Sequence, residues 1–153
     1  MSYLTRLHVA LLLITTGASC HAADLWLNAG STLIHGATKT VGLRVVFQNT
    51  VSDNRADIEI GFQLLGPSDY EGEQPKQAII ITQIVSNISR VDFGLGLAFL
   101  QNSDIYNSGR FNFSLLARYD FSKHLSAEWT HISNGGTHSP NMGRNMVTAR
   151  YKF

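Results

Sequence analysis

Apolar and polar residues alternate along most of the chain, in segments separated by clusters of Gly, Asn, Ser, Asp and Pro. The segment 110–119 is the clearest, because Phe111 and Phe113 fall on one face of an extended chain and Asn112 and Ser114 on the other. A period of two predicts β-strands, each with one apolar face. The pattern as a whole predicts eight strands, near residues 23–32, 38–48, 56–65, 77–86, 91–100, 110–119, 124–133 and 144–153.

The second face of these strands is polar, charged or small. Its charged residues are Arg44, Asp57, Glu59, Asp92, Arg118, Glu128 and Arg150. In the segment 91–100 the bulky side chains alternate with Gly94 and Gly96, as a cramped interior requires. The segment 77–86 is too uniformly apolar for its faces to be assigned. Charged groups on an enclosed face need partners, so we expect these residues to form a structural network of ion pairs.

Alternation alone does not say which face meets water, and a soluble sandwich that buries the apolar faces also fits it. The C-terminus decides, because the alternating apolar row Val147, Ala149, Tyr151 and Phe153 resembles the terminal strand of bacterial outer-membrane β-barrels. The connections between the predicted strands also alternate between a shorter and a longer set. The shorter ones lie near 49–55, 87–90 and 120–123, and the others near 33–37, 66–76, 101–109 and 134–143. Outer-membrane barrels show the same alternation of short periplasmic turns and longer outer loops. We therefore predict an all-β fold, an eight-stranded antiparallel transmembrane β-barrel whose interior is filled by side chains.

The first 22 residues have the features of a cleaved signal peptide. Arg6 supplies the positive start, the apolar stretch 7–15 follows, and cleavage is expected after Ala22, which leaves residues 23–153 as the barrel domain. The single cysteine, Cys20, would leave with this segment, so the mature chain could form no disulfide of its own. Lipidation of Cys20 is the alternative, although Gly17 stands where a lipoprotein signal prefers Leu.

Composition and charge exclude other classes of protein. Charged residues make up only 15% of the chain, and 12 Lys and Arg balance 11 Asp and Glu without runs of either sign. Such a distribution offers no electrostatic surface for a nucleic acid. After residue 22 no stretch is long and apolar enough for a helical membrane anchor. If the protein crosses a membrane, β-strands must therefore cross it.

A polar pair interrupts the apolar face of the seventh predicted strand. His131 and Ser133 share the face of Trp129, and polar side chains facing hydrocarbon are costly without a polar partner. Residues two apart in a strand lie about 7 Å apart at the backbone, close enough for an imidazole nitrogen to reach a hydroxyl after rotation. A serine nucleophile needs such a base, and the base needs an orienting group. Asn145, on the corresponding face of the last strand, is the candidate for that third role.

The connection after Ser133 contains the groups from which an oxyanion hole could be built. Asn134, Gly135, Gly136 and Asn141 offer a permissive backbone and amide donors. Together with His131 and Ser133 they suggest hydrolysis of an acyl ester. Taken singly, each of these residues is also ordinary loop chemistry, since Gly and Asn dominate turns.

The sequence His-x-Ser-Asn-Gly-Gly at 131–136, followed by Pro140-Asn141-x-Gly143 and a strand ending in an aromatic residue, resembles the lipid A 3-O-deacylase (PagL) family of outer-membrane barrels. The resemblance implies Ser133 as nucleophile, His131 as general base, and Asn141 with the backbone of 134–136 as oxyanion hole. The family pattern has Glu as the third member of the triad, where this chain has Asn145. Glu128 is no obvious substitute, because its even number places it on the inward face.

The resemblance also implies the setting of the reaction. The substrate would be lipopolysaccharide in the outer leaflet of a Gram-negative outer membrane, cleaved at the ester-linked acyl chain on the 3 position of lipid A. No cofactor or metal is implied, and the histidines His35, His124 and His138 show no metal-ligand spacing. Membrane lipids and a second copy of the chain are the other candidate partners.

Two alternatives to an esterase remain open from the sequence. A non-enzymatic outer-membrane barrel with a structural or adhesion role would keep the loop and lack activity for want of the Glu. A soluble periplasmic barrel that binds a lipid inside would be extracted without detergent.

Overall fold

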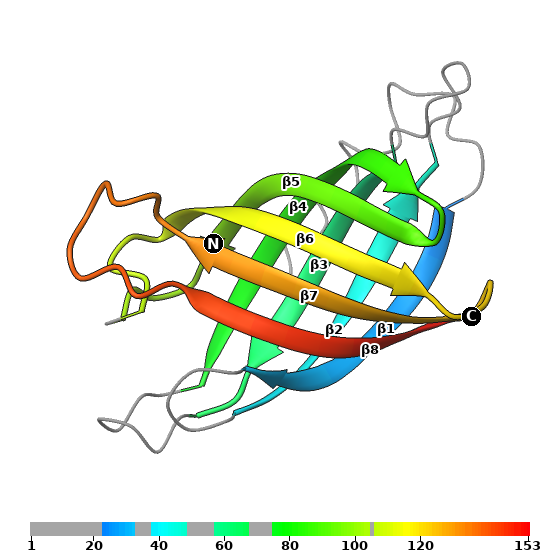
Figure 1. The fold of residues 1–153 in the computed structure, drawn as a ribbon. Coiled ribbons are helices and arrows are strands. Elements are labelled where there is room, and N and C mark those ends of the chain that lie inside the picture. Colours follow the sequence, from blue (N-terminus) through cyan, green and yellow to red (C-terminus); the bar gives the residue numbers. More distant parts are fainter. Residues whose placement is uncertain (1–22, 33–37, 49–56, 68–74, 105) are drawn as a thin grey trace, which may run out of the picture.

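The computed structural model describes residues 23–32, 38–48, 57–67, 75–104 and 106–153, which form one closed β-barrel (Figure 1). Its strands are β1 (Ala23–Thr32), β2 (Lys39–Phe47), β3 (Ile58–Leu65), β4 (Lys76–Ile88), β5 (Val91–Leu100), β6 (Phe111–Asp120), β7 (Leu125–Ser133) and β8 (Arg144–Lys152). Each strand is antiparallel to the next, and β8 pairs with β1 to close the barrel. The predicted fold is thereby confirmed. The predicted signal peptide, residues 1–22, lies outside the described residues and stays a prediction.

Every predicted strand limit agrees with the observed one within two residues. The strand whose faces could not be assigned, β4, is the longest, and a bulge interrupts its pairing with β5 between Ile84 and Ser86. Its even-numbered residues Ala78, Ile80 and Ile84 are buried in the barrel. Its odd-numbered apolar residues are exposed on the outer wall. Both faces of β4 are therefore apolar, one packed inside the barrel and the other part of the outer surface.

The outward faces of the strands form an apolar belt around the barrel. Its exposed large side chains include Leu25, Leu27, Val41, Leu43, Phe62, Leu64, Ile79, Ile81, Phe93, Leu95, Leu97, Phe99, Phe113, Leu115, Trp129, Val147 and Tyr151. A closed barrel pairs its backbone groups between strands, and an apolar exterior suits hydrocarbon rather than water. The predicted orientation of the faces is confirmed. No helix in the described part of the chain is long and apolar enough to cross a membrane.

The interior holds, besides a buried apolar cluster that includes Ala78 and Ile80, a network of charged side chains. Its members, from six different strands, are Arg44, Glu59, Asp92, Arg118, Glu128 and Arg150. Glu59 accepts from Arg44 (3.0 Å), lies 3.3 Å from Arg150 and also pairs with Arg118. Glu128 lies 2.7 Å from both Arg44 and Arg150. The predicted ion-pair network is confirmed, and a lumen filled with charges argues against a soluble barrel that stores a lipid inside.

Close packing of the barrel wall explains the small residues of β5. A Cβ atom on Gly96 would lie 2.0 Å from the backbone oxygen of Ile81 and 2.8 Å from Ser114 Oγ. Only glycine fits such a position, as the cramped interior predicted from this segment requires.

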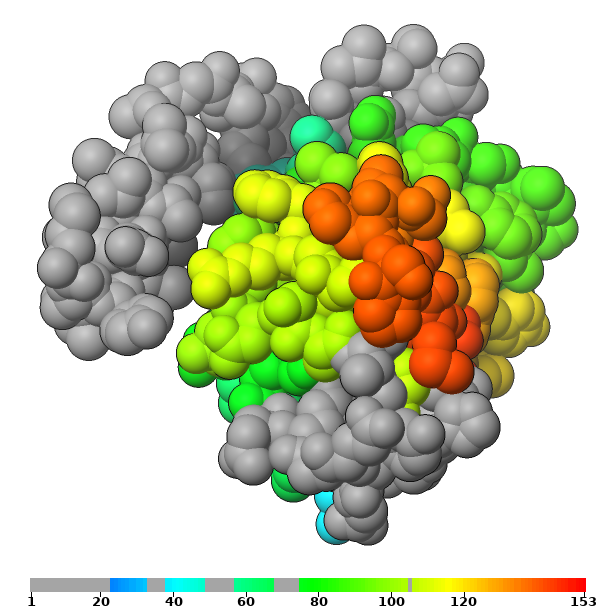
Figure 2. All heavy atoms as spheres, turned by 90° about the vertical axis from the view of Figure 1, so that its left-hand side faces the viewer, coloured from blue at the N-terminus to red at the C-terminus, as the bar shows by residue number. Residues whose placement is uncertain are grey.

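The two ends of the barrel differ. At one end, here named the turn end, β4 and β5 are joined by residues 89–90, and β6 and β7 by residues 121–124. At the other, the loop end, the connections 101–110 and 134–143 are longer. The connection between β2 and β3 also belongs to the turn end, but the connection predicted near 49–55 lies outside the described residues. Figure 2 looks onto the loop end and shows connection 134–143, in orange, beside the yellow-green residues of 101–110.

Candidate active site

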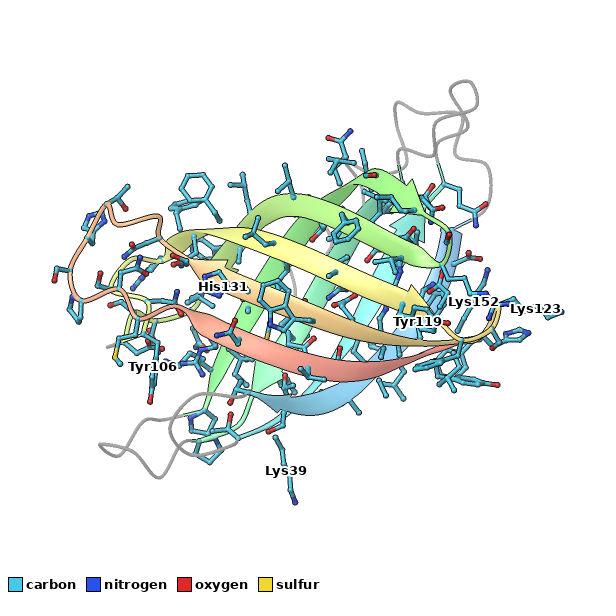
Figure 3. All side chains as sticks on the ribbon, viewed as in Figure 1. Lys39, Tyr106, Tyr119, Lys123, His131 and Lys152 are labelled. Carbon is cyan, nitrogen blue, oxygen red and sulfur yellow. The ribbon has the colours of Figure 1, made fainter. Side chains whose placement is uncertain are left out.

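The residues singled out from the sequence gather at the loop end, where β7 stops and β8 begins; Figure 3 labels His131 there. On β7 the even-numbered Thr130 and Ile132 are buried inside the barrel, whereas His131 and Ser133 are half-buried on the outer wall. The alternation of the strand therefore places the imidazole and the hydroxyl outside, as predicted.

His131 is held by Asn145 on the neighbouring strand. The two residues are direct partners in the register of β7 and β8, and His131 Nδ1 lies 3.0 Å from Asn145 Oδ1. With the amide oxygen as acceptor, Nδ1 bears the hydrogen and Nε2 is left with a free lone pair. Asn145 thus occupies the orienting position expected of a third catalytic residue.

Ser133 is bonded to the loop rather than to the histidine. Asn141 Nδ2 donates to Ser133 Oγ at 3.0 Å, and the Gly135 N–H donates to the same oxygen at 3.2 Å. Among the described residues no hydrogen bond joins Ser133 to His131. The fold brings the pairs His131–Asn145 and Ser133–Asn141 onto one patch of the outer wall.

The loop groups predicted as an oxyanion hole surround Ser133 with distinct roles. The Asn134 N–H donates to Asn141 Oδ1 (3.2 Å), so the Asn141 amide links the backbone to the serine. The buried Asn134 side chain shapes the loop, accepting from the Gly136 N–H (2.9 Å) and donating to the carbonyl of His138 (3.0 Å). In this arrangement Asn141 Nδ2 and the Gly135 N–H are the donors directed at the serine oxygen.

Two residues beside the imidazole had not been assigned to the site from the sequence. The Trp129 ring is stacked on His131, with the centroids 6.0 Å apart and the planes at 18°. Gly143 has φ of +68°, and a Cβ there would lie 2.6 Å from His131 Cε1. The signals were present, since Trp129 shares the face of His131 and Gly143 belongs to the loop motif, but the contacts themselves depend on the register of β7 and β8.

The surroundings of the site are apolar. Phe113 of β6 is the register partner of Ser133, Leu115 is that of His131, and both are exposed on the outer wall. Met142, in the connection between β7 and β8, is also exposed. A polar pair set in an apolar wall at the edge of the belt suits a substrate that is itself a lipid. Among the described residues, no group of three or more His, Cys, Asp or Glu side chains is arranged to hold a metal ion.

Comparison with known proteins identifies the family and the fold. The sequence model of the family "Lipid A 3-O-deacylase (PagL)" matches residues 15–153. Among solved structures, the crystal structure of the outer membrane enzyme PagL is similar in fold, with a TM-score of 0.59 and 17% sequence identity over 85% of this chain and 98% of that one. A search of curated protein sequences gave no match. Since the family match spans the whole barrel, the chain belongs to the lipid A 3-O-deacylase family of outer-membrane β-barrels.

Proposed function

We propose that this protein hydrolyses the ester-linked acyl chain at the 3 position of lipid A, with Ser133 as nucleophile and His131 as general base. The family implies an ester hydrolase and its lipid A substrate. The observation that supports this assignment of residues is the placement of an oriented imidazole and a hydroxyl side by side on the outer wall, within an apolar surface.

The first half of the reaction transfers the acyl chain to the enzyme. Ser133 Oγ attacks the ester carbonyl while its proton passes to His131 Nε2, and the tetrahedral intermediate takes a negative charge on the former carbonyl oxygen. His131 then gives the proton to the leaving 3-oxygen of the glucosamine, which departs as a hydroxyl. The acyl group is left on Ser133.

The second half returns the enzyme to its resting state. A water molecule loses a proton to His131 Nε2 and attacks the acyl-enzyme, and the carbon–Oγ bond breaks as Ser133 recovers its proton from His131. The fatty acid leaves. Both halves require Nε2 to meet Oγ, so Ser133 has to turn from Asn141 toward the imidazole, and catalytic hydrogen bonds are often loose without substrate.

Donors next to the serine would stabilise the oxyanion. Asn141 Nδ2 and the Gly135 N–H already point at Oγ, and the N–H groups of Asn134 and Gly136 lie in the same turn of backbone. Removal of one such donor typically costs on the order of 100- to 1000-fold in rate. We assign this role to Asn141 and to the backbone of residues 134–136.

One observation favours a non-enzymatic barrel as the second candidate. The third position of the triad holds the uncharged Asn145, which orients His131 but gives no charge to stabilise an imidazolium. An Asn fills this role in cysteine proteases of the papain type, so the substitution is compatible with catalysis.

The test is a mass spectrum of lipid A from Gram-negative cells that express the protein. We expect the wild-type chain to remove one hydroxyacyl chain from lipid A, and Ser133→Ala and His131→Ala to remove none while still folding. Lipid A left intact by a folded wild-type protein would support the structural barrel instead.

A further inference from the structure

The connection between β5 and β6, residues 101–110, folds against the end of β7 and the connection 134–143. It forms hydrogen bonds with them at three points. Tyr106, Asn107 and Ser108 are consecutive, and each contacts a different part of the β7–β8 hairpin. Figure 3 places Tyr106 and His131 at the same end of the barrel, and Figure 2 shows the two connections in contact. The central residue of the three, Asn107, is the most informative.

Asn107 is completely buried and donates two hydrogen bonds through one amide nitrogen. One goes to Asn112 Oδ1 on β6 (2.9 Å), and the other to the backbone carbonyl of Ile132 on β7 (3.2 Å). That carbonyl belongs to the peptide bond between Ile132 and Ser133. The amide therefore holds the backbone between the two residues proposed to do the chemistry, from the inside of the barrel.

The neighbours of Asn107 extend this attachment to both sides of the site. Ser108 Oγ accepts from Asn134 Nδ2 at 3.0 Å, directly after the proposed nucleophile. The Tyr106 carbonyl accepts at 2.9 Å from the N–H of Gly143, the glycine at which an added Cβ would clash with His131. The loop itself is braced by Asp104, which accepts from the N–H groups of Tyr106 (2.7 Å) and Asn107 (2.8 Å).

We infer that Asn107 is a positioning residue for the deacylase site. Its hydrogen bond to the carbonyl of Ile132 fixes the backbone between His131 and Ser133, and with it the position of Ser133 relative to His131. The inference rests on the proposed function. Through this bond Asn107 would hold the end of β7, where Ser133 is followed by a loop with two glycines, so that a rotated Ser133 side chain can reach the base. A shift of about 1 Å in a reacting group can cost on the order of 100-fold in rate.

The test replaces Asn107 in the full chain by Leu, which removes the donor, and by Asp, which keeps size and polarity should the Leu variant fail to fold. The readouts are kcat and KM for fatty-acid release from lipid A in detergent micelles, and the rate at which a fluorophosphonate labels Ser133. We expect kcat to fall about 10- to 100-fold with KM within about twofold of wild type, and labelling to slow by a similar factor. Folding is followed by the heat-dependent shift of barrels on SDS gels.

Gln63→Leu is the matched control. Gln63 is a buried amide of β3, four strands away from β7 around the barrel, and it bonds Thr40 rather than the catalytic hairpin. Its loss should leave kcat and labelling unchanged. Folded Asn107 variants with wild-type kcat and labelling would overturn the inference. Since labelling needs no lipid, it reports on Asn107 even if the wild-type protein leaves lipid A intact, a result that would contradict only the proposed function.

Discussion

At the scale of single residues, the candidate site depends on the amide of Asn145, which can orient the imidazole of His131 but brings no negative charge to it. Asn145 Oδ1, 3.0 Å from His131 Nδ1, selects the tautomer in which Nε2 is the free base. A carboxylate in that place would select the same tautomer and, in the mechanism proposed above, would also stabilise the imidazolium formed as Ser133 loses its proton. The rate is therefore expected to be limited by the missing charge rather than by a wrongly placed histidine.

Substitutions at Asn145 separate these two contributions. Asn145→Ala should lower kcat about tenfold by releasing the imidazole, and Asn145→Glu should raise it by roughly tenfold by adding the charge. Asn145→Gln is the control for side-chain length, and it should not reproduce the gain. Initial rates of fatty-acid release measure all three, and a rate that is indifferent to Ala and Glu would remove Asn145 from the mechanism.

Gly143 is expected to tolerate no side chain. Alanine there would be strained at φ +68° by about 1–2 kcal/mol and would place Cβ 2.6 Å from His131 Cε1. Gly143→Ala should therefore reduce kcat on the order of 100-fold with the barrel still folded. Gly143→Asn is the matched comparison, because Asn adopts a positive φ more readily than Ala but places its Cβ at the same point beside His131. A Gly143→Asn variant with wild-type kcat would mean that backbone strain, and not the imidazole contact, is responsible for the loss in Gly143→Ala.

At the scale of the strands, alternation decides both the stability and the site. The same two-residue period that puts Leu95 and Leu97 toward the lipid puts Gly94 and Gly96 inside, and on β7 it puts His131 and Ser133 outside. A strand shifted by one residue would reverse every face. The position of the pair proposed as catalytic is therefore a consequence of the register that builds the apolar belt.

A charge in the middle of the belt tests that orientation. Leu95, at the centre of β5 and 53% exposed, should cost about 2–4 kcal/mol when replaced by Arg, whereas Ile88→Arg at the end of β4 should cost about 0–1 kcal/mol. Urea unfolding in lipid vesicles gives both values. Equal costs at the two positions would place the lipid-facing belt elsewhere.

At the scale of the whole molecule, most of the fold follows from the sequence and part of the site does not. The strong alternation in 91–100 and 110–119 predicts these two strands and the direction in which their side chains point. The faces of β4 are ambiguous in the sequence because Ile79, Ile80 and Ile81 are equally apolar. Only closure of the barrel distinguishes the face in the lumen from the face toward lipid. The sequence of residues 131–136 predicts where the candidate site lies. The contact of Asn107 with Ile132 could not be anticipated, because it joins residues 25 positions apart through a loop.

The charged interior holds the barrel together as a unit. Glu59, fully buried, pairs with arginines from three other strands, and its replacement by Leu would remove the carboxylate that all three arginines share. Glu59→Leu should lower the free energy of unfolding by about 3–5 kcal/mol. Asn28→Leu is the control, since both polar atoms of that buried side chain lack a hydrogen-bond partner among the described residues and its loss should be neutral or stabilising. A Glu59 variant as stable as wild type would show that the network only fills space.

The measurement that tests the account most directly is fatty-acid release from purified lipid A by refolded wild-type protein and by Ser133→Ala, with the folded fraction of each determined in the same sample. The account predicts that the wild-type barrel releases one 3-linked hydroxyacyl chain per lipid A and that the alanine variant releases none. Release by the alanine variant at the wild-type rate would contradict it.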